Sequence, residues 1–272
     1  MDRDGSRLAW METTTTDTVT ADWWVRYYAD GHAETVAKSS DLGHGKTLPY
    51  VIDDQISLVA NTIYWTSTYP AKNGKLDSAA ILYKDVGGDH SYHVLAEDAF
   101  LHVSNHAGQL DYLVPNGATA AIKSVAPGGS PVIIMPNACI ADYYVLALGA
   151  DATRVAWAVA PKNETDPATP PSTYHSWIYV LSLTDHTLTE IAGYGDGTDA
   201  ITISKNWMAW GNGSGNGSGQ EFVMNLATGA ITVLADSYGY SEAAVSYPAV
   251  AWRTQPSNST DPVPLHIGFL TQ

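Results

Sequence analysis

The sequence is short of several features that define broad classes of protein. It contains a single cysteine, Cys139, so no internal disulfide bond can form. No run of about 18 apolar residues occurs, and the sequence therefore shows no membrane-spanning helix. The first residues also lack the basic, then apolar, then small-residue order of a secretory signal peptide.

Positive charge is scarce. Lysine and arginine together number 13, against 28 aspartates and glutamates, which gives a formal net charge of −15. Binding to nucleic acid or to an anionic membrane surface depends on basic residues, so this balance argues against both partners. The overall charge favours a metal cation or a cationic partner instead.

Signatures of common catalytic sites are also missing. The sequence has neither the G-x-S-x-G motif nor the S-x-x-K motif of serine nucleophiles. A glycine-rich stretch at 211–220 lacks the lysine of a phosphate-binding loop, so nucleotide binding is not supported. Four Asn-x-Ser/Thr sequons are compatible with an exported protein, and we expect an extracellular or cell-envelope location. The sequons begin at Asn163, Asn212, Asn216 and Asn258.

What the sequence does contain is a repeat. A short apolar segment that ends in an aromatic residue first occurs as DGSRLAW at 4–10, and it returns at spacings between 42 and 55 residues. A period of this length is typical of the four-stranded blades of β-propellers. The recurring aromatic residues are Trp10, Trp65, Tyr112, Trp157, Trp210 and Trp252.

The segments around each aromatic residue follow one order. A second β-strand pattern comes next, then in most copies a tight turn rich in Gly, Asp or Asn, and then a third strand pattern. A short strand pattern precedes every copy except the first, and we name the four strands A to D, with the aromatic residue at the end of strand B. We therefore predict an all-β chain that forms a β-propeller of about six four-stranded blades. The blade repeats are predicted at about 1–40, 41–97, 98–137, 138–193, 194–236 and 237–272.

The two terminal blades are predicted to be incomplete. The first lacks strand A, and the last ends after strand C. We accordingly expect one propeller domain over 1–272 that belongs to a longer protein. The strand-B tryptophans are expected to pack between neighbouring blades rather than to stack on a ligand.

The first copy of the repeat resembles the A–B hairpin of TolB-type, WD-like β-propeller repeats. The residues that match are Asp4, Gly5, Leu8, Ala9 and Trp10. Later copies keep a serine, as at Ser204 and Ser246, but lose the Asp-Gly pair. The resemblance implies the fold and says little of the activity, because this fold serves many unrelated functions.

A carboxylate stands just before each predicted strand A after the first blade. If the blades close, these acids form a ring at one mouth of the channel, where calcium or a polyhydroxyl ligand could bind. The alternative is that each acid accepts hydrogen bonds from loop N–H groups. Tyrosines beside them suit a sugar or a Lys/Arg side chain of a protein partner. The candidate residues are Asp54, Asp98, Asp142, Asp199 and Glu242, with Tyr143, Tyr194 and Tyr240.

Four histidines gather between the second and third blades, at His90, His93, His102 and His106. Residues three apart on a strand face opposite ways, so this spacing does not converge on one metal ion. We expect these histidines to form hydrogen bonds rather than a metal site.

Three functions fit these observations. The first is a non-enzymatic recognition or sensor module, a monomeric domain that binds a protein or small ligand at one face of the channel. The alternative is a carbohydrate-active, glycosidase-like enzyme that uses the carboxylates of the channel mouth. The third is a structural scaffold without a ligand site.

Overall fold

The computed structural model describes most of the chain: residues 2–13, 23–42, 55–69, 78–88, 91–99, 101–139, 143–161, 177–191, 198–212, 219–237, 242–254 and 263–271. These residues form 23 strands and one short 3-10 helix, η1 (Ser39–Leu42). Within these ranges no helix has the length and hydropathy needed to cross a membrane. The chain divides into two compact units, Met1–Pro136 (unit 1) and Asn137–Gln272 (unit 2), and we describe each by itself.

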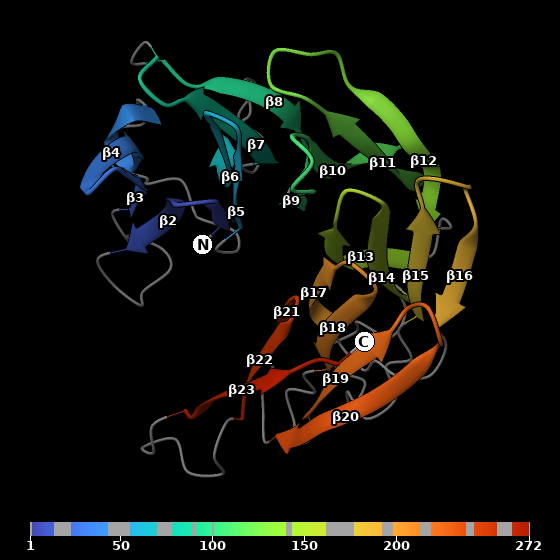
Figure 1. Ribbon diagram of the computed structural model, residues 1–272. Helices are drawn as coiled ribbons and strands as arrows, with labels where there is room; N and C mark the ends of the chain where they lie inside the picture. Colours follow the sequence, from blue (N-terminus) through green and yellow to red (C-terminus); the bar gives the residue numbers. More distant parts are fainter. Residues whose placement is uncertain are drawn as a thin grey trace, which may run out of the picture. The chain divides into compact units, whose positions relative to one another are not determined.

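Unit 1 carries three antiparallel sheets in chain order (Figure 1). The first contains β1 (Asp2–Asp4), β2 (Arg7–Thr13), β3 (Trp23–Ala29) and β4 (His32–Lys38). The second contains β5 (Ile56–Val59), β6 (Thr62–Tyr69), β7 (Ser78–Asp85) and β8 (His93–Glu97). The third contains β9 (His102–Ser104), β10 (Leu110–Asn116), β11 (Thr119–Val125) and β12 (Val132–Cys139), whose last residues cross into unit 2.

Unit 2 repeats this organisation. Its first sheet contains β13 (Tyr143–Ala150), β14 (Arg154–Pro161), β15 (Trp177–Ser182) and β16 (Leu188–Ile191). Its second contains β17 (Thr198–Ser204), β18 (Trp207–Asn212), β19 (Gly219–Asn225) and β20 (Ala230–Ser237). Its third contains β21 (Glu242–Ser246), β22 (Ala249–Arg253) and β23 (Leu265–Phe269). Six meandering sheets in chain order confirm the predicted all-β, six-bladed propeller class.

The first blade corrects one prediction. We expected it to lack strand A, but β1 pairs with β2, with Asp2 opposite Ala9 and Asp4 opposite Arg7. Three polar residues carry no apolar alternation, so no sequence pattern marked them as a strand. They pair because Gly5, at φ +63°, closes a tight hairpin. The sixth sheet has three strands in the described part of the chain, as predicted.

Three strand-B tryptophans, Trp65, Trp157 and Trp210, are fully buried. Trp65 and Trp210 each lie in a hydrophobic cluster with residues of the preceding blade, which confirms the predicted packing between blades for these two. Trp65 packs against Trp23 and Val25 of the preceding blade. Trp10 differs, because it is only partly buried.

Successive A strands lie close together within each unit. At Gly149 on β13, an added Cβ would meet the carbonyl oxygen of Ile201 on β17 at 2.4 Å, so only glycine allows this approach. Side-chain oxygens of one A strand also accept backbone N–H groups from the A strand of a neighbouring blade, which satisfies donors on an otherwise free strand edge. The acceptor and donor pairs are Asp2 with Leu58 (2.8 Å), Gln55 with His102 (3.0 Å), Thr202 with Val245 (2.8 Å) and Ser204 with Tyr247 (3.1 Å).

Candidate functional site

The A–B turns of neighbouring blades are joined by an arginine. In unit 1, Arg7 at the start of β2 donates from Nη1 to Asn61 Oδ1 in the next A–B turn, at 2.8 Å. In unit 2, Arg154 at the start of β14 donates from Nη2 to Asn206 Oδ1 at 3.2 Å. The arginine stands three residues before the strand-B tryptophan in both cases, and the asparagine stands four before the next one. The repeat therefore places the same arginine–asparagine latch in both units.

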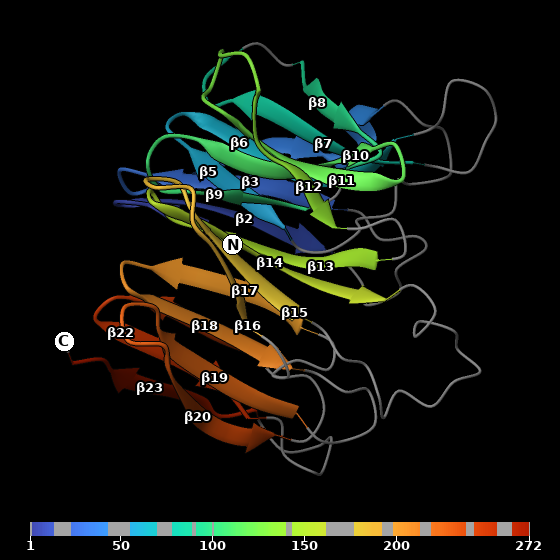
Figure 2. The ribbon, with the colours of Figure 1, turned by 90° about the vertical axis from the view of Figure 1, so that its right-hand side faces the viewer.

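In unit 2, the latch includes contacts of a third residue, Lys205. Arg154 Nη1 donates to the carbonyl oxygen of Lys205 at 2.9 Å. The Lys205 ammonium lies 4.4 Å from the centre of the Tyr247 ring, at a distance typical of a cation–π contact. We call these residues, Arg154, Lys205, Asn206 and Tyr247, the turn cluster. Their A–B turns lie at the left ends of the strands in Figure 2.

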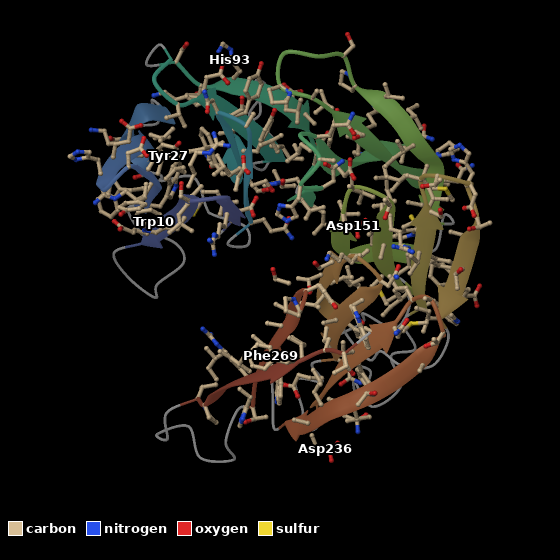
Figure 3. All side chains as sticks on the ribbon, in the orientation of Figure 1. Trp10, Tyr27, His93, Asp151, Asp236 and Phe269 are labelled. Carbon is tan, nitrogen blue, oxygen red and sulfur yellow. The ribbon has the colours of Figure 1, made fainter. Side chains whose placement is uncertain are left out.

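Local sequence explains why the turn cluster holds its shape. Asp151, which Figure 3 labels, accepts at its Oδ1 the backbone N–H groups of Thr153 and Arg154. These bonds, of 2.8 and 2.9 Å, fix the turn between β13 and β14. Lys205 adopts φ +56° at the tip of the β17–β18 hairpin. The turn cluster is therefore presented on tight, hydrogen-bonded turns.

The two latches differ in charge. Arg7 forms an ion pair with Asp4. Arg154 and Lys205 contact a carbonyl, an amide and an aromatic ring, all of them neutral. In the part of the chain that the structure describes, no carboxylate oxygen lies within 4.0 Å of either cationic group. Among the described residues, the two cationic groups of the turn cluster therefore have no ion-pair partner.

A buried hydroxyl–imidazole pair lies in unit 1. Ser57 Oγ and His102 Nδ1 are 2.9 Å apart, and the two residues are 2% and 4% exposed. Burial lowers the pKa of His102 to about 3, so the ring is neutral at ordinary pH. A substrate has no access to side chains this deeply buried, so the pair joins the A strands of two blades.

A second buried polar group lies at the β9–β10 hairpin. Asp111 is fully buried, and its Oδ1 lies 3.5 Å from Asn105 Nδ2. Burial raises the pKa of Asp111 to about 6, although hydrogen bonds to Ser124 and Asn105 lower it in part. Asn105 Oδ1 in turn accepts the N–H groups of Ala107 and Gln109, which shapes the hairpin. The Asp111 carboxyl group therefore helps to hold the β9–β10 turn in place through Asn105.

Most of the predicted carboxylate ring lies outside the described residues. Among the predicted acids, Asp54 and Asp142 are wholly outside, as are the side chains of Asp199 and Glu242. The predicted tyrosines Tyr194 and Tyr240 also lie outside. Asp98 is exposed, at φ +54° ahead of β9. Tyr143 is half-buried, with its ring 5.6 Å from that of Trp177. The acid ring and its calcium ion therefore stay predictions.

The histidines separate as expected from strand geometry. His102 is buried and bonded to Ser57, whereas His93 is exposed on β8 with its ring 5.1 Å from that of Tyr83. His106 is exposed in the β9–β10 turn, and His90 lies outside the described residues. Among described residues, no group of three or more His, Cys, Asp or Glu side chains could hold a metal ion.

Sequence reasoning missed the turn cluster. Its signal was present, because an arginine three residues before one strand-B tryptophan pairs with an asparagine four residues before the next. Arg154 and Asn206 are 52 positions apart, however, and only the packing of adjacent blades joins them.

An apolar sheet face is also exposed in unit 2. Alternate residues of β23 point away from the sheet core, namely Leu265 (61% exposed), Ile267 (61%) and Phe269 (78%). The register places Ala251 and Ala249 of β22 on the same face, and Phe269 is labelled in Figure 3. This face is the largest run of exposed apolar side chains on a single described strand.

Comparisons with known proteins support the fold alone. No protein-family model matches the sequence, and no curated protein matches it. TolB from Acinetobacter baumannii is similar in structure, with a TM-score of 0.55 and 11% identity over 97% of this chain and 61% of that one. An acylaminoacyl peptidase from Pyrococcus horikoshii gives a TM-score of 0.58 and 10% identity, over 81% of this chain and 38% of that one. An oligogalacturonate lyase in complex with manganese gives 0.56 and 7%, over 92% and 74%.

These values confirm the resemblance to TolB-type β-propellers at the level of the fold. The chain spans less than two thirds of the length of TolB and of the peptidase. Only about 10% of the residues are identical in these comparisons. The structural similarity therefore does not assign an activity to this chain, because one propeller fold serves many functions.

Proposed function

We propose that this chain is a non-enzymatic β-propeller recognition module that binds a protein partner at the A–B turn end of unit 2. The observation that carries the proposal is the turn cluster, in which Arg154 and Lys205 keep their charge beside the ring of Tyr247. Arginine and tyrosine are enriched among the residues that dominate binding energy at protein interfaces. Loops on a rigid scaffold are also where binding residues concentrate.

Rigidity supports the same proposal. Tyr247 N donates to Ser204 Oγ at 3.1 Å, and Arg154 binds the next turn through two of its nitrogens. A surface that is ordered before binding loses less conformational entropy when the partner arrives. We also propose an extracellular or cell-envelope location, which the four sequons support.

The carbohydrate-active alternative depends on the predicted carboxylates at the heads of the A strands. The one whose side chain is described, Asp98, is exposed and belongs to unit 1, whereas the turn cluster belongs to unit 2. The turn cluster itself offers cations and an aromatic ring, and glycoside hydrolysis needs a pair of carboxyl groups. This geometry favours recognition over hydrolysis.

A peptide-display selection on the immobilised protein tests recognition without assuming which partner binds. We expect selected peptides to bind the wild-type chain and to lose binding to the double variant R154Q/K205N, in which asparagine tolerates the positive φ of position 205. R7Q is the matched control, because Arg7 has the same place in the repeat and is already paired with Asp4. Selected peptides that bind the double variant as well as the wild type would refute the proposed surface.

A further inference from the structure

We infer that the turn cluster recognises a carboxylate in an acidic segment of the protein partner. This inference rests on the proposed function and names the chemistry of the partner. It runs against the overall charge of −15, which favours cationic partners. The local arrangement around Arg154 and Lys205 outweighs that average, because exposed charges more than about 10 Å apart are largely screened at physiological salt.

The guanidinium of Arg154 has a free edge. Nη1 donates to Lys205 O at 2.9 Å and to Thr153 Oγ1 at 3.3 Å, and Nη2 donates to Asn206 Oδ1 at 3.2 Å. A guanidinium carries five N–H donors, so Nε–H and one Nη2–H have no acceptor among the described residues. Nε and Nη2 share one edge of the group, and such an edge binds a carboxylate through two parallel hydrogen bonds.

Lys205 adds a second charge on the adjacent turn. Its backbone carbonyl is the acceptor for Arg154, and its ammonium group lies 4.4 Å from the centre of the Tyr247 ring. The ring holds the ammonium in place without neutralising it, as a carboxylate would. The adjacent turn therefore carries a second cation for the acidic segment of the partner, and the half-buried Tyr247 side chain lies beside that cation.

The chain contains its own comparison. Arg7 occupies the equivalent position and makes the equivalent bond to Asn61, but the carboxylate of Asp4 already occupies its guanidinium. Asp151, the carboxylate nearest in sequence to Arg154, instead uses its Oδ1 for the turn N–H groups of Thr153 and Arg154. Within the described part of the chain, one latch arginine thus has an internal carboxylate, and the other has none and can accept an external one.

The test is fluorescence anisotropy with a labelled octapeptide that contains four consecutive glutamates, titrated with the whole chain at physiological salt, about 0.15 M. A glutamine version of the peptide is the control for charge. We expect saturable binding of the glutamate peptide, at least about tenfold weaker binding to R154Q and to K205N, and wild-type binding to R7Q. K205N removes a charge without touching the latch, so a loss of binding there is separate from any change in the turn itself.

Three results would overturn the inference: no saturable binding of the glutamate peptide, equal binding of the glutamine peptide, or an equal loss in R7Q. The display selection separates this failure from failure of the proposed function. Selected peptides that depend on Arg154 but lack acidic residues would keep recognition and reject the carboxylate. Circular dichroism of each variant confirms that the fold is intact.

Discussion

Replacing Asp111 with asparagine is expected to stabilise the protein at neutral pH. Asp111 is fully buried beside Asn105, and burial raises the pKa of its carboxyl from 3.8 to about 6. A folded-state pKa above the unfolded one means that the folded state binds the proton more tightly. The free energy of unfolding therefore falls as the pH rises from about 4 to about 6.

The size of the effect follows from the same pKa values. The pKa of the Asp111 carboxyl is about 2 units higher in the folded protein than its ordinary value. The free energy of unfolding is therefore about 3 kcal/mol lower above pH 6 than at low pH, where the carboxyl is protonated in both states. Asparagine has the shape of the carboxyl and never ionises, so D111N should recover at most about 3 kcal/mol at pH 7.5, a gain reduced by the amide N–H donors that replace the buried, unpaired Oδ2. At pH 4.5 the folded wild type holds its proton, and the difference should shrink to about 1 kcal/mol.

Urea unfolding followed by tryptophan fluorescence at both pH values measures this difference. His102 changes stability with the opposite sign, since its lowered pKa favours folding at higher pH, but it is present in both proteins and cancels. D98N is the matched control, because Asp98 is exposed and its replacement should change little at either pH. A D111N variant that is less stable at pH 7.5, or whose effect does not depend on pH, would refute the reasoning.

Four further changes test the fold and the predicted ion site. G149A should lower the unfolding free energy by about 1–3 kcal/mol in urea titrations, because its Cβ would meet the carbonyl of Ile201; unchanged stability would contradict the close strand packing. W157A should cost about 3–5 kcal/mol in the same assay, since the side chain is fully buried and its Nε1 donates to Ala138 O at 2.6 Å; a near-neutral result would show that it is not core. F269S should change stability by less than about 0.5 kcal/mol and reduce the fluorescence of a dye that binds apolar surface, because Phe269 is 78% exposed; a large loss would mean that the ring is packed. If the carboxylate ring binds calcium, millimolar calcium should raise the thermal midpoint, EDTA should reverse the shift, and D199N should weaken it; no shift would leave these acids as hydrogen-bond acceptors.

The blade repeat could be predicted from the sequence because its causes are local. Alternating apolar residues form strands, Gly, Asp and Asn close the hairpins, and an aromatic at a fixed place in each repeat marks strand B. These signals act within a few residues, so they identified six sheets and their order. The one strand that they missed, β1, consists of three polar residues and exists only because a turn returns it to β2.

Tertiary structure decided everything that depends on which blade lies beside which. Trp10 and Trp210 occupy the same place in the repeat, yet only Trp210 is fully buried, in a cluster with residues of the preceding blade. Arg7 and Arg154 likewise bind the turn of the next blade, through Asn61 in unit 1 and Asn206 in unit 2. The sequence by itself determined the strands and their turns, and even the local ion pair of Arg7 with Asp4, whereas the links between turns were determined by contacts between residues more than 50 positions apart.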